Sequence, residues 1–211
     1  DLWGTEYRAK FAGQGAWRCN VPRPRELEQV WLYLREDGPN AGLMPLADDL
    51  MYMWCTSNED SADWKDSAVL GREMRNIVSK VGGLYGELRD RYLTDDAVVV
   101  YRPFEYVDLP SPWHKGSVVL IGDASHAATA HLAQGAAMAM EDAVVLGDEV
   151  AKGGAAPDVL ERWEERRYAR CRWIAENSLK ICRHEQGKLN EPGFEVMATM
   201  IEGRKRAMAP I

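Results

Sequence analysis

The sequence has few cysteines, no long apolar run and no excess of positive charge, and each absence excludes a class of protein. The four cysteines lie far apart and form no Cys-x-x-Cys pair: Cys19, Cys55, Cys171 and Cys182. This spacing argues against a zinc site and predicts reduced thiols in a cytoplasmic protein. No stretch approaches the roughly 20 apolar residues of a membrane span. The formal net charge of −7 argues against nucleic acid as a partner.

A glycine-rich dinucleotide-binding turn is also absent. No Gly-x-Gly-x-x-Gly follows an apolar strand, and the nearest approximation, "GLYGEL", follows a helical pattern instead. The chain opens with "DLWGTEYR", without an initiator methionine and without a lead-in. We therefore expect the sequence to be part of a longer protein.

Short apolar runs separated by glycine and proline predict β-strands over residues 5–56. The five runs are "TEYRAKF", "GAWRCNV", "LEQVWLYL", "AGLMPL" and "LMYMWCTS". Breaks are predicted at residues 13–15, at the prolines of 22–24, at Gly38-Pro39 and at Pro45. The simplest arrangement of such runs is an antiparallel meander.

Apolar residues recur at three- and four-residue steps over residues 70–84, which predicts an amphipathic helix. We expect Gly82-Gly83 to end this helix and a short second helix to cover residues 88–92. Residues 97–107 return to a strand pattern, in which Pro103 implies an edge position or a bulge.

The second half of the chain has a different pattern, with one short apolar run followed by helical segments. The run "SVVLI" at 117–121 predicts a strand buried on both faces, as in a parallel α/β sheet. Residues 132–151 predict a helix that Gly153-Gly154 ends. Pro157 suits the start of a long helix that reaches about residue 184, and a short helix is expected near 196–201.

One carboxylate and few other polar side chains follow the predicted buried strand, in "GDASHAATAHLAQGAAM". Ligands of open α/β sheets bind beyond the carboxyl ends of the strands, so Asp123 is suited to accept hydrogen bonds from sugar or ribityl hydroxyls. Capping of local N–H groups is the alternative. We interpret His126 and His131 as structural, because no third metal ligand accompanies them.

Small residues open the next predicted helix, namely Ala133, Gly135, Ala136 and Ala137. A helix N-terminus exposes unpaired N–H groups, and small side chains let a ligand approach them closely. A flat ring with carbonyl acceptors suits such a surface. Ordinary close packing of helices is the alternative interpretation.

Residues 118–147 resemble the second flavin-binding motif of the FAD-dependent aromatic hydroxylases, the single-component flavoprotein monooxygenases of the para-hydroxybenzoate and salicylate hydroxylase type. The matching positions, in order, are Gly122, Asp123, Ala124, His126, Gln134, Gly135, Glu141, Asp142, Ala143 and Leu146. Residues 11–24, 42–53 and 161–178 resemble the substrate-domain strands and C-terminal helix of this family.

The resemblance implies the C-terminal part of such an enzyme, with an α+β chain that is part of an FAD/NAD(P)-binding α/β fold. It implies an antiparallel substrate-domain sheet with helices (1–112), a flavin-contacting strand, loop and helix (113–152), and a closing helix and tail (153–211). The N-terminal dinucleotide-binding unit is then missing and becomes the expected partner, while a homodimer stays open. FAD is the implied cofactor, NADH or NADPH the reductant, O₂ a co-substrate, and a small aromatic or N-heteroaromatic compound the substrate.

The resemblance also implies flavin contacts at Gly122, Asp123, Ala124, Gln134, Gly135, Ala136 and Ala137. Asp123 would hold the ribityl chain, and the backbone N–H groups of residues 134–137 would face the pyrimidine edge. Ala130 stands where many relatives have proline, and Leu132 and Ala137 also depart from the pattern, which leaves the shape of this loop open.

Arg18 is the weak candidate for a catalytic or substrate-binding role, with an ordinary surface arginine as the alternative. The substrate-pocket candidates are Trp17, Tyr52, Trp54, Tyr101 and Ala130, although aromatic residues on strands are more often core. Arg167 and Arg170 lie on an apolar helical stripe and suggest a partner carboxylate, for example on the missing part, with surface arginines that only extend their charged ends to solvent as the alternative. A flavoprotein with other redox chemistry and a non-catalytic remnant are the alternative functions.

Overall fold

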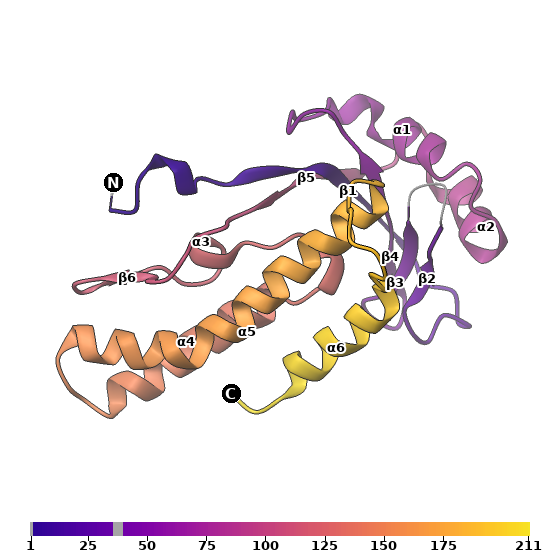
Figure 1. Cartoon of the computed structure of the whole chain (residues 1–211). Coiled ribbons are helices and arrows are strands. Elements are labelled where there is room, and N and C mark those ends of the chain that lie inside the picture. Colours follow the sequence, from indigo (N-terminus) through magenta and orange to yellow (C-terminus); the bar gives the residue numbers. More distant parts are fainter. Residues whose placement is uncertain (1, 36–39) are drawn as a thin grey trace. The chain divides into compact units, whose positions relative to one another are not determined.

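A computed structural model of the chain describes residues 2–35 and 40–211, which Figure 1 shows in full. They form two compact units: unit 1 combines the residues up to Ala12 with Glu105–Ile211, and unit 2 is Gly13–Phe104. This division differs from the three predicted segments, because residues 105–112 belong to unit 1 and residues 113–211 form one unit rather than two. The predicted break at Gly38-Pro39 lies outside the described residues.

A five-stranded sheet organises unit 2, in the order β2-β3-β4-β1-β5. Its strands are β1 (Lys10–Pro22), β2 (Trp31–Tyr33), β3 (Ala41–Pro45), β4 (Leu50–Asn58) and β5 (Val99–Tyr106). The β2–β3, β3–β4 and β4–β1 pairs are antiparallel. The predicted meander is confirmed for β2, β3 and β4, but β1 pairs with β4 rather than with its sequence neighbour β2. Pro103 lies on the edge strand β5, where a residue without an N–H group is tolerated.

The first two predicted strands are wrong in detail. Thr5–Tyr7 forms a short 3-10 helix, and β1 continues without a break through residues 13–15. The register explains the continuity, because Gln14 pairs with Asn58 and Gly15 pairs with Ser57 of β4.

Side chains alternate across the sheet as strand geometry requires. Trp17 and Cys19 of β1 are buried, whereas Arg18 and Asn20 between and beyond them are exposed. The buried face packs against the helices of unit 2, and its core cluster contains Val21, Leu43, Met53, Cys55, Met74, Val78, Tyr85 and Tyr101, among others. The sheet therefore has one face covered by helices and one face of mixed polar and aromatic residues.

The two helices of unit 2 are α1 (Leu70–Ile77) and α2 (Gly83–Tyr92). The predicted helix end at Gly82-Gly83 and the predicted second start at residue 88 are both wrong. Arg89 of α2 stabilises the segment that follows the end of α1, because its Nη1 donates to three carbonyl oxygens there. These carbonyls belong to Val78, Ser79 and Val81, at 2.8–3.0 Å.

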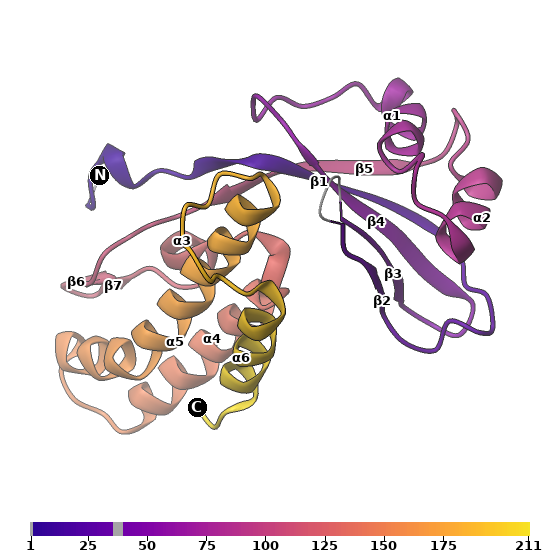
Figure 2. The same cartoon turned by 45° about the vertical axis from the view of Figure 1, so that its right-hand side comes forward.

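Helices dominate unit 1. They are α3 (Asp123–His126), α4 (Gly135–Ala151), α5 (Ala156–Glu185) and α6 (Val196–Met208). The predictions for α4 and α5 are confirmed within a few residues, and α6 is longer than predicted. Figures 1 and 2 both show α4 and α5 lying side by side, and the chain reverses between them through Gly153 and Gly154, whose φ angles are positive.

The predicted buried strand at 117–121 is wrong. Only β7 (Val118–Val119) is a strand, and it pairs antiparallel with β6 (His114–Lys115). Val118 is 45% exposed. A strand of a parallel sheet is buried by neighbouring strands and by helices on both faces, and the described residues supply only this hairpin partner.

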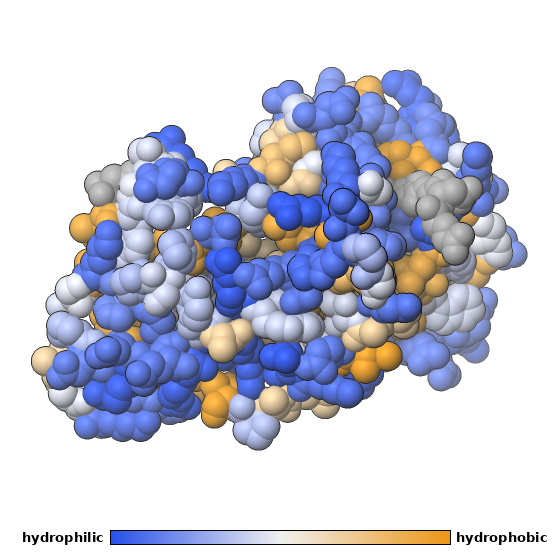
Figure 3. Space-filling model, viewed as in Figure 1, coloured by the Kyte–Doolittle hydropathy of each residue, from blue (hydrophilic) through white to orange (hydrophobic). Residues whose placement is uncertain are grey.

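The surface of unit 1 is mixed in character. In the view of Figure 3, hydrophilic side chains cover most of the surface over α5, with isolated hydrophobic side chains between them. No helix among the described residues is long and apolar enough to cross a membrane. The interior contains aromatic side chains, including Trp113 and Trp163, together with several ionic groups between α4 and α5.

Candidate functional site

The Gly-Asp turn lies at the start of the short helix α3. Gly122 has φ 57° and ψ −137°, a conformation that favours glycine, and a Cβ at this position would lie 3.0 Å from the Cβ of Ala139. Asp123 follows as the first residue of α3 and is exposed. Among the described residues no hydrogen bond or ion pair engages its carboxylate, so local capping does not account for it.

The second predicted element, the start of α4, presents open backbone. Ala133 precedes it in the left-handed conformation with φ 53°, and Gln134 caps the helix without a side-chain hydrogen bond. The first N–H groups of a helix have no intrahelical partner. A Cβ at Gly135 would meet no atom within 4 Å. Ala136 is exposed and Ala137 is half-buried. A flat ligand can therefore reach this backbone without displacing a side chain.

These two elements fit the flavin that the sequence resemblance implies. The exposed Asp123 carboxylate is suited to hydroxyl donors, and the N–H groups at the start of α4 are suited to carbonyl acceptors. The other predicted flavin contacts differ in exposure: Ala124 is exposed, Gln134 is half-buried and Gly122 is buried. The N–H of Gly122 donates to Asp142 Oδ2 at 2.9 Å, so it faces the interior.

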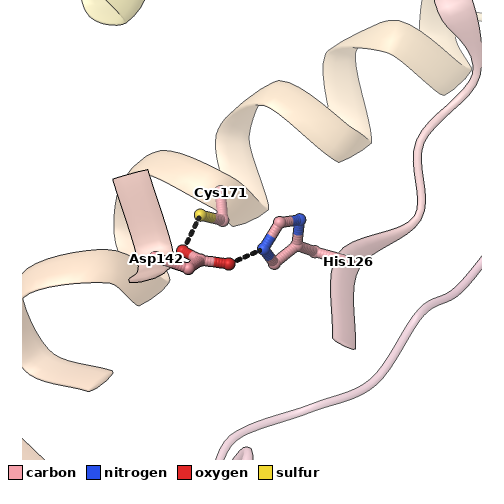
Figure 4. Close-up of side chains that lie close together, drawn as sticks. All are labelled: His126, Asp142 and Cys171. Atoms are coloured by element: carbon pink, nitrogen blue, oxygen red, sulfur yellow. Dashed lines mark hydrogen bonds and ion pairs between the residues drawn. The ribbon is translucent and has the colours of Figure 1, made fainter. Parts of the chain in front are cut away.

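Asp142 of α4 is the centre of a buried hydrogen-bonded cluster that Figure 4 shows in part. Besides Gly122, its Oδ2 accepts a hydrogen bond from His126 Nε2 at 2.7 Å. Its Oδ1 accepts one from Arg167 Nε of α5 at 2.8 Å. Burial of the fully enclosed carboxyl alone would raise its pKa, but the hydrogen bonds from His126, Arg167 and the Gly122 N–H outweigh burial and lower the pKa of Asp142. The group is an ion inside the protein.

The predicted partner carboxylates of the two arginines are found within the chain itself. Arg167 Nη1 donates to Glu141 Oε2 at 2.6 Å, in addition to the bond with Asp142. Arg170 Nη1 bonds the same Glu141 oxygen at 3.1 Å. The suggestion that the carboxylate lies on a missing part is therefore wrong, because α4 and α5 pack so that their opposite charges meet.

His126, Asp142 and Cys171 place one potential metal ligand each within 4.8 Å of one another. Their atoms are already used, since Asp142 accepts from His126 and, at 3.7 Å, from the Cys171 thiol. Burial, with the nearby Asp142 charge, raises the pKa of Cys171 to about 12, so the thiol stays protonated. A cation here would also lie beside the Arg167 guanidinium. The geometry favours the structural interpretation of His126.

The predicted pocket residues of unit 2 lie on two different faces of the sheet. Arg18 is paired in register with Trp54, and its guanidinium lies 5.8 Å from the ring centroid of Tyr52. These three side chains share the exposed or half-buried face. Trp17 and Tyr101 instead lie in the core, with ring centroids 4.7 Å apart, which favours the core interpretation for both.

The last pocket candidate, Ala130, is exposed and begins a 3-10 turn of three residues before α4. A groove of about 400 Å³ lies elsewhere in unit 1 and is lined by Trp113, His126 and Arg172, among others. Arg172 bridges this groove by pairing with Asp108 and with Glu176. The pair with Asp108 ties the segment after β5 to α5, whereas Glu176 lies on α5 itself. The residues that line the groove include neither Asp123 nor the start of α4.

The antiparallel sheet unit and the helical unit with its Gly-Asp turn are the elements that the sequence resemblance implies for a flavoprotein, and comparisons with known proteins agree. The model of the FAD binding domain family matches residues 4–178. The chain belongs to this family.

Individual relatives point the same way. The chain is 31% identical over 191 residues to a Bacillus subtilis protein named "Putative FAD-dependent monooxygenase YetM", covering 90% of this chain and 51% of that protein. It is 28% identical over 185 residues to an FAD-dependent urate hydroxylase of Klebsiella oxytoca, covering 85% and 47%. The crystal structure of Klebsiella pneumoniae HpxO complexed with FAD and uric acid shares the fold, with a TM-score of 0.75 at 22% identity over 96% of this chain and 50% of that one. The chain thus spans about half the length of these relatives.

Proposed function

We propose that the protein is an FAD-dependent monooxygenase that hydroxylates a small aromatic or N-heteroaromatic compound with NADH or NADPH and O₂. The observation that carries this proposal is the presence in unit 1 of two features. The exposed Asp123 carboxylate makes no hydrogen bond or ion pair among the described residues, and the helix start at Gly135 leaves its backbone open. Membership of the FAD binding domain family and the names of the relatives support it.

Each element of the chain has a separate task in this proposal. Asp123 accepts hydrogen bonds from ribityl hydroxyls, and the N–H groups at the start of α4 donate to the flavin carbonyl oxygens. Arg18, Tyr52 and Trp54 form the sheet face on which an aromatic ring is oriented. The bound flavin, once reduced, supplies the activation of O₂, so the chain needs few acid or base side chains of its own.

We also propose that an upstream dinucleotide-binding unit completes the site. The outer face of α4 supports this, since Met140 is 64%, Val144 57% and Val150 60% exposed. They share one helical stripe with exposed small residues, namely Ala136, Ala143 and Gly147. A soluble helix that is apolar on its outer face is normally covered. Such a unit would bring the glycine-rich turn that binds pyrophosphate.

We also propose a cellular location for the protein. The four cysteines are free and buried, which supports a reducing, cytoplasmic location. The homodimer stays a prediction.

The first test compares residues 1–211 alone with the same chain joined to its upstream sequence. We expect the first to be colourless and the second to hold stoichiometric FAD through gel filtration. Flavin retained by residues 1–211 alone would contradict the proposed upstream unit. Phenolic or pyridinol compounds should stimulate NAD(P)H oxidation in the longer protein and yield a hydroxylated product. Oxidation without that product would indicate other redox chemistry, and a colourless longer protein would indicate a non-catalytic remnant.

The second test is Asp123→Ala in the flavin-holding protein. Loss of one charged hydrogen-bonding group should raise the dissociation constant of FAD by roughly tenfold to a hundredfold. Asp158→Ala is the matched control, because Asp158 is another exposed aspartate in the first turn of a helix. We expect it to leave FAD affinity unchanged. Equal affinities for both variants would remove Asp123 from the flavin site.

A further inference from the structure

One carboxylate oxygen from outside the turn that carries Asp123 bonds both ends of that turn. Asp142 Oδ2 bonds the N–H of Gly122, which precedes α3, and the Nε2 of His126, which ends it, at 2.9 and 2.7 Å. Within the turn, Ser125 N and His126 N donate to Gly122 O at 3.0 and 2.9 Å, Ser125 Oγ donates to the same oxygen at 3.2 Å, and Ala124 N donates to Ile121 O at 3.3 Å. The two ends of α3 are thus tied to one point.

The turn needs such a tether because it has little stability of its own. A helix of four residues lies far below the length at which helices are stable alone. Gly122 at its start can adopt the positive φ that the turn requires, but fixing a glycine costs more backbone entropy than fixing another residue. The direction of the Asp123 side chain therefore depends on contacts that lie outside the turn.

Asp142 is itself fixed firmly enough to act as that contact. Its Oδ1 is bonded by Arg167 Nε at 2.8 Å, and its backbone carbonyl accepts from Trp163 Nε1 at 3.0 Å. Both donors come from α5, and all three residues are completely buried. The carboxylate is held on one side by α5 and holds the turn on the other.

We infer that Asp142 is a positioning residue for flavin binding: it fixes the Gly122–Asp123 turn and so sets where the Asp123 carboxylate points, without touching the flavin itself. This inference rests on the proposed flavin site. It predicts that loss of the Asp142 charge weakens flavin binding through the turn, and not only through the general stability of unit 1.

Glu149 supplies a matched control for general stability. It lies two turns further along α4, is also buried, and its carboxylate bonds Lys152, Arg162 and Arg166 at 2.6–3.0 Å. Among the described residues, the hydrogen bonds and ion pairs of the Glu149 carboxylate go to Lys152, Arg162 and Arg166, and none goes to α3. Asp142→Asn and Glu149→Gln each remove one buried negative charge from the α4–α5 interface, but only the first affects the turn.

The experiment measures FAD affinity in the flavin-holding protein and amide hydrogen exchange in residues 1–211. We expect Asp142→Asn to raise the FAD dissociation constant at least about tenfold and to accelerate exchange of the Gly122 N–H by a similar factor. Glu149→Gln should lower the melting temperature but leave both readouts near the wild-type values.

Equal FAD affinities in Asp142→Asn and Glu149→Gln would overturn the inference. If Asp142→Asn does not fold, the exchange rate of the Gly122 N–H in the wild type still tests the inference, because an amide bonded to a buried carboxylate is protected from exchange. An unprotected Gly122 N–H in the wild type would equally overturn it. Absence of FAD from the wild-type protein would instead refute the proposed function, while the exchange measurement would continue to test the tether.

Discussion

Unit 1 and unit 2 bury their polar groups in different ways. In the described part of unit 2 the buried polar residues are uncharged, namely Gln14, Asn40 and Thr56. Unit 1 buries ionisable groups between its helices and beside β6, and these are His126, Asp142, Glu149, Glu164 and Arg167. The sheet unit is therefore held mainly by apolar contact, whereas the helical unit also depends on paired charges.

This difference matches the tasks proposed for the two units. Apolar packing tolerates small changes of shape at moderate cost. A buried ion pair contributes little net stability, because desolvation offsets the attraction, but its loss is costly and its geometry is specific. Among these groups, Asp142 bonds both ends of the turn that carries Asp123, through the Gly122 N–H and His126 Nε2, where the proposed flavin site needs a fixed backbone.

The largest expected effect comes from removing a buried cation of unit 1. Arg167→Met leaves Asp142 without its guanidinium partner and should destabilise unit 1 by about 3–5 kcal/mol. Urea denaturation followed by region-resolved hydrogen exchange checks this. Arg204→Met, at an exposed position of α6, should change stability by no more than about 0.5 kcal/mol. A similar result for both variants would mean that the buried pair does not support unit 1.

A smaller loss is expected from the apolar core of unit 2. Met53 is fully buried between the sheet and its helices, and Met53→Ala should cost roughly 2–5 kcal/mol through lost contacts and a cavity. The loss should not depend on pH, and it should appear in the exchange of unit 2. Val100→Ala on the edge strand, where the side chain is 47% exposed, is the control and should cost far less.

Sequence patterns predicted those parts of each unit that follow from periodicity. The alternation in β1 and β4 and the long stripe of α5 follow from local spacing, and the structure confirms them. The end of α1 at Ile77 could not be predicted in this way, because the carbonyl groups beyond it are bonded by Arg89 of the next helix, a contact that apolar spacing does not encode.

The candidate site shows the same division. Asp123 and the small residues at the start of α4 were identifiable from order and residue type. The tether at Asp142 was visible only as a motif match, and the partner of Arg167 was assigned to the wrong part of the protein. The first depends on how α4 packs against the turn at α3 and the second on how α4 packs against α5, and no local pattern encodes either contact.

Acid should lower the stability of unit 1 at a higher pH than that of unit 2. The hydrogen bonds from Lys152, Arg166 and Arg162 lower the pKa of Glu149 from its usual 4.5 to about 2, and the pKa of Asp142 is also lowered. A depressed carboxyl pKa contributes stability that is complete above the unfolded pKa and is lost as the pH falls through the folded pKa. Unit 1 should therefore lose exchange protection between about pH 4.5 and 2, before unit 2. Glu149→Gln should flatten this dependence, and simultaneous loss in both units would show that buried charge does not distinguish them.

The smallest effect on stability, with a selective effect on activity, is expected at the open face of the sheet. Arg18 is exposed and pairs in register with Trp54, so Arg18→Lys should change stability by no more than about 0.5 kcal/mol. A guanidinium can hold a carboxylate through two parallel hydrogen bonds, which an ammonium cannot reproduce. If Arg18 orients an acidic substrate, the KM for that substrate should rise roughly tenfold, as expected for one lost hydrogen bond to a charged group. The KM for a neutral phenol of the same size should stay nearly constant. An equal rise for both substrates would remove Arg18 from carboxylate recognition and indicate a contact with the flavin instead.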